Sequence, residues 1–339
     1  NITTGTKVIP AAIGVVTYTG NGTSQDITGL GFSPDLVWVK ARTFTYDHNL
    51  TDSVRGSYYL STSGTSAQSN GDTVVSSLDA DGFSVGSSLN VNSSGSQYIA
   101  WCWDAGDTTV TNTEGSVESQ VRSNGTFSIC TFPAPDGIGG DATFGHGLNT
   151  APAMVITKSL ITGAWYVYHQ YSGADPTRFY TILNDASPSA DAGEGGAWVS
   201  APTDTLFTYG TNFSSGAGTP VVAYCWTESP TQSFGSYTGT EAEQTITLGF
   251  APAFVLIKSA TGGEQWYVYD TTRQTSNTYP YLRPNLSDTE ESLSSRNIEL
   301  TDSGFTVVGA DGSINTNNNT YIYAAFAGEI ITETTSNTT

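Results

Sequence analysis

Positive charge is scarce in this sequence. The 339 residues include 11 Lys and Arg against 31 Asp and Glu, which gives a formal net charge of −20. A surface of this sign repels phosphate backbones and anionic lipid headgroups, so we expect no nucleic-acid partner. The chain also lacks a run of apolar residues as long as a membrane-spanning helix, so we expect no membrane insertion.

Cysteine and histidine are also few. Cys102 and Cys225, two of three cysteines, take matching positions in apolar segments, so we expect buried thiols rather than disulfides. The three histidines have no metal-ligand spacing, and no Gly-x-Ser-x-Gly or phosphate loop is present. The sequence therefore predicts a protein without a metal, a cofactor or an enzymatic activity. A glycosidase needs only two carboxylates, so that activity stays open.

The most informative feature that is present is one pattern repeated three times. A proline is followed by a bulky apolar run and then by a lysine. The chain has only four lysines, and three of them occupy this position. The copies are GLGFSPDLVWVK at 29–40, GHGLNTAPAMVITK at 145–158 and LGFAPAFVLIK at 248–258, which end at Lys40, Lys158 and Lys258.

The spacing between successive copies, from Lys40 to Lys158 and from Lys158 to Lys258, is too long for a solenoid repeat and predicts whole domains in tandem. The predicted parts are an N-terminal arm at 1–13, repeat 1 at 14–106, a linker at 107–125, repeat 2 at 126–229, repeat 3 at 230–330 and a flexible tail at 331–339. The linker prediction rests on a polar composition without hydrophobic period. The short connection between repeats 2 and 3 favours a shared interface, and the long one before repeat 2 favours more freedom for repeat 1.

Within each repeat, short apolar segments are separated by Gly, Asn, Asp and Ser, a pattern typical of antiparallel β-sandwiches. Alternation places Leu36, Trp38 and Lys40 on one face of a strand and Val37 and Val39 on the other. Both faces are apolar before the lysine, so we expect a central strand. The lysine would end it with its ammonium in water or on a carboxylate. The predicted fold class is all-β, with tandem antiparallel β-sandwich domains.

A polar motif follows this strand in repeats 1 and 3. Asp52-Ser-Val-Arg55 matches Asp270-Thr-Thr-Arg273, and His48 lies just before the first copy. One interpretation is a ligand-binding pair that offers forked donors to a sugar or a carboxylate. The other is a structural ion pair that fixes a loop, which its recurrence favours. Repeat 2 lacks a clear Asp-x-x-Arg.

Two aromatic segments are the other candidates for ligand binding. Trp165 and Trp266 begin the segments WYVYH and WYVYD, which are aromatic on both faces of a strand. An exposed face would stack on a glycan ring or fill a subunit interface. The alternative is packing between sheets or between domains.

The ordered set of motifs resembles a known family. GFSPDLVWVKAR, DHNLTDSVRG, DGFSVGS and YIAWCWDAG, followed by the companion motifs WYVYH, AYCW, FGSYTG, FAPAFVLIK and YIYAAFAGE, resemble a repeated domain of virion structural proteins of marine, cyanophage-like bacteriophages. The resemblance covers about residues 14–330. It implies a jelly-roll, laminin-G-like or lectin-like sandwich and a tail-fibre-like role, and it carries over no catalytic residue.

The function expected from these observations is that of a non-enzymatic structural protein of a tailed bacteriophage. It would lie on the tail or capsid surface of the virion, assemble with other virion proteins and adhere to a host cell-surface glycan. A homotrimer is expected by analogy with tail fibres and spikes. Two alternatives stay open: a glycan-binding module without a structural role, and a secreted subunit of a surface layer or extracellular filament.

Overall fold

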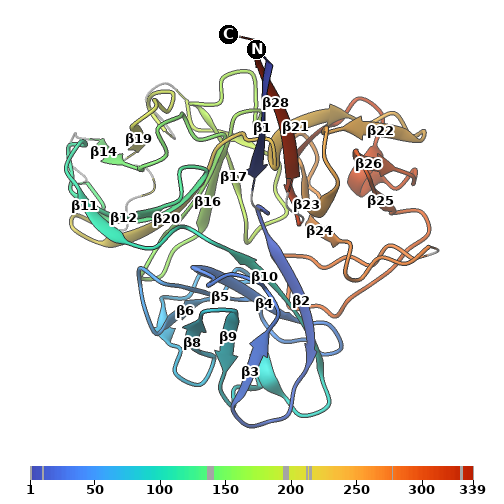
Figure 1. Cartoon of the computed structure of the whole chain (residues 1–339), viewed down its shortest axis with the longest axis horizontal. Coiled ribbons are helices and arrows are strands. Elements are labelled where there is room, and N and C mark those ends of the chain that lie inside the picture. The colour runs from blue at the N-terminus through green and yellow to red at the C-terminus, as the bar shows by residue number, and fades with distance from the viewer. Residues whose placement is uncertain are drawn as a thin grey trace.

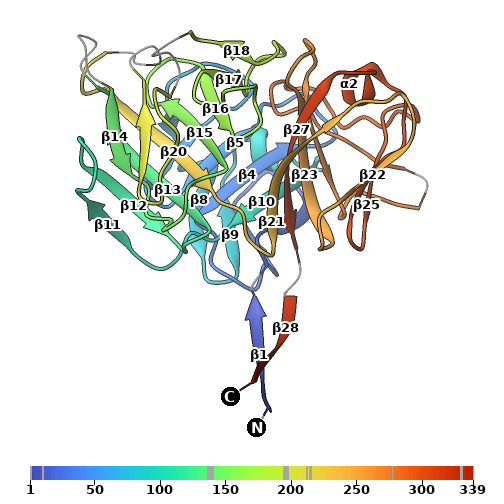
Figure 2. The same ribbon diagram turned by 90° about the horizontal axis from the view of Figure 1, so that it is seen from above.

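The protein is all-β and antiparallel throughout the part that the computed structural model describes (Figure 1). The described residues are 2–9, 11–135, 141–193, 198–210, 213, 216–276, 278–328 and 331–338. They form three β-sandwich units and one two-stranded ribbon (Figures 1 and 2). No helix in these ranges is long and apolar enough to cross a membrane.

Unit 1 packs a six-stranded sheet on a three-stranded one. The larger sheet has the order β2 (Gly14–Thr19), β10 (Gln97–Trp103), β4 (Leu36–Ala41), β5 (Asn49–Asp52), β6 (Tyr58–Leu60) and β7 (Ser69–Asn70). The smaller sheet has the order β3 (Gln25–Thr28), β9 (Gly82–Val85) and β8 (Val75–Asp79), and the short helix α1 (Leu89–Asn92) precedes β10.

Unit 2 repeats this plan with two additional strands at one edge. Its larger sheet has the order β11 (Thr109–Asn112), β12 (Ser119–Ser123), β13 (Phe127–Pro133), β20 (Pro220–Trp226), β15 (Met154–Ser159), β16 (Trp165–His169), β17 (Phe179–Ile182) and β18 (Ala190–Asp191). The smaller sheet pairs β14 (Ala142–Gly145) with β19 (Leu206–Tyr209).

Unit 3 has a four-stranded sheet and a three-stranded sheet. The first has the order β21 (Gln232–Thr238), β27 (Thr320–Ala327), β23 (Pro252–Ser259) and β24 (Trp266–Asp270). The second has the order β22 (Gln244–Thr247), β26 (Gly304–Val307) and β25 (Ile298–Thr301), and the short helix α2 (Gly312–Asn315) precedes β27.

The repeated strand is central in every unit, as its apolar pattern predicts. β4, β15 and β23 each pair with a strand on both sides and are buried almost throughout. Val37 and Val39 face the core of their own sandwich, whereas Leu36 and Trp38 face a second core. Because side chains alternate along a strand, a strand with two apolar faces requires apolar neighbours on both sides.

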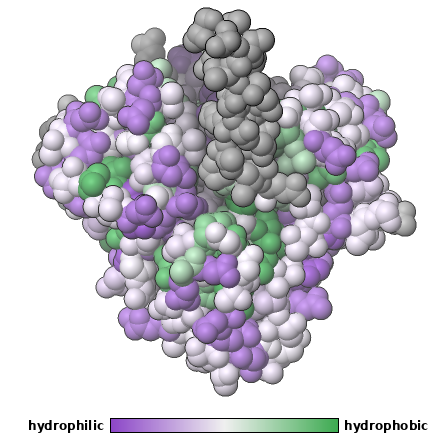
Figure 3. Space-filling view, in the orientation of Figure 1, coloured by the Kyte–Doolittle hydropathy of each residue, from purple (hydrophilic) through white to green (hydrophobic). Residues whose placement is uncertain are grey.

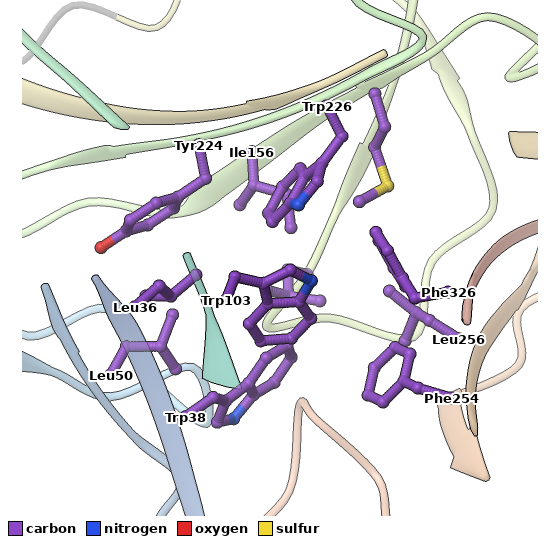
Figure 4. Close-up of a pocket in the computed structure, with 12 residues that line it drawn as sticks. Leu36, Trp38, Leu50, Trp103, Ile156, Tyr224, Trp226, Phe254, Leu256 and Phe326 are labelled. Atoms are coloured by element: carbon purple, nitrogen blue, oxygen red, sulfur yellow. The ribbon is translucent and has the colours of Figure 1, made fainter. Parts of the chain in front are cut away.

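That second core is shared by all three units. The inner faces of the three larger sheets meet in it, and Trp103 touches rings from the other two units (Figure 4). Its ring centroid lies 6.1 Å from that of Trp226, 5.7 Å from that of Phe254 and 5.6 Å from that of Phe326. An apolar space of only about 20 Å³ remains between these side chains. The units therefore surround a common centre in a pseudo-threefold arrangement.

Three predictions about chain organisation are wrong. Residues 107–125 are not a linker, because β11 and β12 lie within them and extend the sheet of unit 2. Residues 331–339 are not a flexible tail over 331–338, because β28 (Ile331–Thr338) pairs antiparallel with β1 (Ile2–Ile9). Unit 1 also has no special freedom, since it shares the central core. Polar Ser/Thr-rich strands give little hydrophobic period, because much of their stabilisation comes from backbone pairing.

The cysteine prediction is confirmed. Cys102, Cys130 and Cys225 are free and buried. Cys102 lies in the core of unit 1, and Cys225 lies in the separate core of unit 2.

Truncating the central tryptophan should destabilise all three units together. Trp103→Ala removes a fully packed indole, and such a substitution costs about 3–5 kcal/mol of unfolding free energy. We expect one calorimetric transition in both proteins, at a lower temperature in the variant. Val110→Ala, at a side chain that is 55% exposed on β11, is the control and should change stability by about 0.5 kcal/mol or less. Separate melting of one unit would contradict the shared core.

Candidate functional site

The residues singled out in the sequence lie at the junctions between units and are buried. His48, Asp52, Trp165, Trp266, Asp270 and Arg273 expose at most a few per cent of their surface, and the Arg55 side chain is buried as well. The same three junctions are built from equivalent strand positions. The registers make Asp52, His169 and Asp270 equivalent, and likewise Trp101, Tyr224 and Ala324 on the neighbouring strand.

At the junction of units 1 and 2, a buried ion pair binds a tyrosine. Arg55 Nε donates to Asp52 Oδ2 at 2.6 Å. Tyr224, from β20 of unit 2, donates its hydroxyl to the same carboxylate oxygen at 2.7 Å, and Arg55 in turn donates to the Tyr224 hydroxyl at 3.2 Å. Burial raises the pKa of Tyr224 well above its usual value. The phenol therefore stays protonated and acts as a donor that ties the two units together.

At the junction of units 3 and 1, the same ion pair binds a tryptophan. Arg273 Nε donates to Asp270 Oδ2 at 2.6 Å, and Trp101 of unit 1 donates its indole N–H to that oxygen at 3.2 Å. Arg273 also donates to Glu290 at 3.1 Å, and Glu290 accepts two bonds from Arg42 of unit 1, each 2.9 Å long. This carboxylate thus joins two guanidinium groups from different units.

At the junction of units 2 and 3, neutral groups take the positions of the aspartate and of its donor. His169 takes the aspartate position, and its Nε2 lies 3.0 Å from the Tyr323 carbonyl of unit 3. Burial lowers the pKa of His169 to about 4, so the ring is neutral at pH 7 and donates from Nε2. Ala324 takes the position of Trp101 and Tyr224, and no side-chain donor arises there. The missing Asp-x-x-Arg in repeat 2 is therefore matched by a missing donor on its neighbour.

A second set of equivalent residues, one in each unit, lies near the same junctions. Trp165 of unit 2 donates its indole N–H to the Ser61 carbonyl of unit 1, and Trp266 of unit 3 donates to the Ile182 carbonyl of unit 2, both at 2.9 Å. His48 occupies the equivalent position in unit 1 and accepts a 2.9 Å bond from Trp38. Burial lowers its pKa well below the usual value, and the charge of Lys40 lowers it further. The aromatic side chains of His48, Trp165 and Trp266 are all packed between units.

Backbone bonds complete each junction in the same cyclic order. The residue two positions after each repeated lysine offers its carbonyl to the next unit around the axis. Gln68 N donates to Leu160 O at 3.0 Å, Ser189 N to Ala260 O at 2.8 Å and Glu290 N to Arg42 O at 2.8 Å. One backbone bond therefore recurs at all three junctions.

The three repeated lysines are fully buried beside these bonds. Lys40 donates to carbonyls of Ala41 at 2.7 Å and of Ser287 in unit 3 at 3.2 Å. Lys258 donates to carbonyls of Ser259 at 2.7 Å and of Ala186 in unit 2 at 3.2 Å. Burial lowers the pKa of each repeated lysine to about 8. The expectation that these lysines reach water or a carboxylate is wrong, because carbonyl oxygens surround the ammonium.

The geometry corrects the ligand-binding interpretation of all seven predicted residues. All seven are buried and each bonds a partner inside the chain, so a sugar or carboxylate in solvent does not reach them. The alternative interpretations, a structural ion pair and packing between domains, agree with the contacts. Reasoning from the sequence missed the roles of Tyr224, Trp101 and Glu290, since each is distant in sequence from its partner. The only available signal was their equivalence in the aligned repeats.

The surface offers other candidates. A cleft of about 370 Å³ lies between units 1 and 3, and one of about 250 Å³ lies in unit 1 between β5, β6 and β8. The exposed ring of Phe44 stacks on Tyr46, with centroids 5.8 Å apart. Within the described ranges, no group of three or more His, Cys, Asp or Glu side chains is placed to hold a metal ion.

Comparison with known proteins places the chain in a family. The family model described as a domain of unknown function, DUF7483, matches residues 12–329. A search of curated proteins found no match. The family match covers all three sandwich units, from the residues before β2 to the end of β27. The shared core and the three junctions therefore belong to one family domain rather than to three separate ones.

Removing one partner of a buried junction pair should be costly. Asp52→Ala leaves the Arg55 guanidinium buried without its carboxylate and removes the acceptor of Tyr224. We expect a loss of about 3–5 kcal/mol in unfolding free energy, measured by chemical denaturation. The matched control is Arg178→Ala, which breaks an ion pair with Asp191 whose side chains are both 39% exposed and should cost about 1 kcal/mol or less. Equal effects would contradict the structural assignment.

The buried lysines should make the protein more stable as pH rises from 7 to 9. Each lysine has a folded pKa of about 8, below its unfolded value, so the charged form opposes folding at pH 7. This cost is relieved as pH rises through 8, by about 1 kcal/mol per lysine at pH 9. Lys258→Met should lose its share of that increase.

The measurement is the difference between wild type and Lys258→Met in unfolding free energy at the two pH values. Burial raises the pKa of Cys102, which lowers stability near pH 9, but this effect is the same in both proteins and cancels. An identical pH dependence in the two proteins would contradict the lysine assignment.

Proposed function

We propose that this member of the DUF7483 family is a non-enzymatic structural protein of a bacteriophage virion, carried on the tail or capsid surface. The proposal rests on the order of the repeated motifs and on one structural observation. The residue two positions after the repeated lysine joins each unit to its neighbour, through an equivalent backbone bond at all three junctions. A single chain thereby builds the kind of threefold body that fibres and spikes build from three chains.

The non-enzymatic part of this proposal is supported by where the reactive side chains lie. The buried carboxylates Asp52 and Asp270 each accept bonds from an arginine and an aromatic donor. His48 and His169 have lowered pKa values because they are buried. A general acid or base must lie within reach of a substrate. These groups are held in the interior as parts of the scaffold.

Both ends of the chain leave the body together. β1 and β28 pair along their length, and the termini lie at the tip of this ribbon, away from the three units (Figure 2). Such a ribbon suits attachment of the body to a neighbouring virion protein. A homotrimer, proposed by analogy, would use the ribbon or the outer surfaces, because the junction groups are already bonded within one chain.

Adhesion to a host glycan is the finer part of the proposal, and exposed aromatic rings support it. Phe44 is 50% exposed and stacks on Tyr46 in the loop after β4. Tyr58 and Tyr171 are also exposed. Aromatic faces bind sugar rings, and a stacked pair keeps its orientation at low entropic cost. The same observation supports the second candidate function, a glycan-binding module without a place in the virion.

The test begins with particles of the phage whose genome encodes this chain. We expect mass spectrometry of purified virions to detect the protein at a fixed copy number, and immunogold labelling to place it on the tail or capsid surface. Purified particles that lack the protein would contradict the virion role.

Adhesion is tested separately with the purified chain and host cells. Binding should fall at least tenfold on Phe44→Ala/Tyr46→Ala if these rings stack on a surface glycan. Arg178→Ala, a change at a distant surface ion pair, should leave binding unchanged. Saturable binding without virion incorporation favours the glycan-binding module, and unaltered binding by the double variant would refute the assigned rings.

A further inference from the structure

Each larger sheet contains an equivalent strand, and the outer side of that strand is covered differently in the three units. The registers make β2 of unit 1, β13 of unit 2 and β21 of unit 3 equivalent, and they align Val15 with Ile129 and with Phe234. Alternate residues of an antiparallel edge strand direct their N–H and C=O away from the paired strand. At each of the three positions, these outward groups need a partner or solvent.

In unit 2 the outward edge is covered by another strand. β12 pairs with β13 and sets Arg122 opposite Ile129. The Arg122 side chain then crosses the junction to Asp35 of unit 1, at 2.5 Å. The occupant of this edge is thus an antiparallel segment that carries a basic residue.

In unit 3 the outward edge is covered by side chains. Gln170 of unit 2 donates to the Phe234 carbonyl at 2.8 Å, and the Phe234 N–H donates to Glu228 at 2.9 Å. Gln170 also donates to Glu228 at 3.0 Å. These two side chains satisfy the outward N–H and C=O of Phe234.

In unit 1, the N–H groups of Ala12 and Ile13, just before β2, donate to the Ala327 carbonyl of unit 3 at 2.9 and 3.3 Å, and the edge is open at Val15. The residues equivalent to Gln170 and Glu228 are Thr271 and Gly328, whose side chains are too short to reach the strand, and with Val15 they line the cleft of about 370 Å³. Among the residues that the structure describes, no side chain or strand bonds the outward N–H and C=O of Val15. Figure 3 shows hydrophobic surface near the start of β2, and Ile13, Pro252 and Leu300 belong to the same cleft.

We propose that the open edge of β2 is a strand-addition site that takes an extended segment of a partner protein carrying a lysine or arginine. The segment would run antiparallel to β2 and fill the cleft, as β12 does at the equivalent edge of unit 2. Asp302 lines the cleft and provides the carboxylate for the basic residue, in the role that Asp35 has for Arg122. Main-chain bonds give the affinity of such a contact, and the charged pair selects the sequence.

This occupant is favoured over a second copy of the chain by charge. The chain has a net charge of −20 and Asp302 lines this cleft, so the edge attracts a basic segment more strongly than it attracts a second copy of this acidic chain. The proposal concerns the fold itself and does not depend on a role in a virion.

The probe is a capped peptide with the sequence of residues 116–125, SVESQVRSNG, which contains the internal occupant of the equivalent edge. The intact chain should bind the labelled peptide saturably, as measured by fluorescence anisotropy, and its β2 amides should gain protection in hydrogen exchange. In the free chain, the Val15 amide should exchange at least a hundredfold faster than the Ile129 and Phe234 amides.

Two pairs of variants separate binding from folding. Thr17→Pro removes an outward N–H of β2 without removing a bond to β10, and it should weaken peptide binding at least tenfold, whereas Thr17→Ala retains the N–H and should bind normally. Thr271→Gln recreates the cap seen at Phe234 and should also weaken binding, whereas Thr271→Ser should not. Melting temperatures near that of wild type show that the four variants are folded.

The charge assignment is tested with a second peptide in which the arginine is replaced by alanine. This peptide should bind wild type at least fivefold more weakly in low salt, and Asp302→Asn should remove the difference between the two peptides. Failure of the first peptide to bind at millimolar concentration, equal binding by Thr17→Pro and Thr17→Ala, or slow exchange of Val15 in the free chain would each overturn the proposal. Self-association lost on Thr17→Pro would assign the edge to a second copy and overturn the basic segment.

Discussion

The structure depends on a strand that is apolar on both faces. In β4, β15 and β23 one set of alternate side chains closes the sandwich of its own unit, and the other set faces the core that the three units share. An isolated unit would expose this second face, which includes side chains as large as Trp38. Burying one large apolar side chain contributes about 1.5–3 kcal/mol. The three units therefore require one another, and the central core follows from the alternation itself.

The sequence was sufficient for much of this scaffold and for little of its assembly. The repeated proline-to-lysine segment predicts the central strand, because the apolar run and the turn residues that bound it lie within one short stretch of sequence. Lys258 shows the limit: its position was clear, but its partners are carbonyls of its own strand end and of Ala186 in another unit. The partners of Asp52 and Trp266 were equally inaccessible, since no periodicity connects positions so distant in sequence. β11 and β12 were missed because each contains a single valine, Val110 or Val121, and one apolar residue in a strand gives no hydrophobic period.

At the junctions, the side chains that differ between repeats are matched to their partners across the interface. A carboxylate at Asp52 or Asp270 is matched by an aromatic donor on the next unit and by an arginine on its own. Where unit 2 has His169, the neighbour presents a backbone carbonyl, and both the arginine and the donor are gone. A buried charge without its partner is costly, so these positions change together. Each unit therefore fits only one place around the axis.

Fusion of three units into one chain permits an asymmetry that three identical chains do not have. In a symmetric trimer, the three edges equivalent to β2, β13 and β21 would carry the same residues and would all be open or all be covered. Here one edge is covered by a strand, a second by Gln170 and Glu228, and the third faces the cleft between units 1 and 3. Open edges invite unwanted pairing, and of the three equivalent positions Val15, Ile129 and Phe234, only Val15 is left without a cover among the described residues. The tandem repeat thus makes three equivalent positions of a threefold scaffold different from one another.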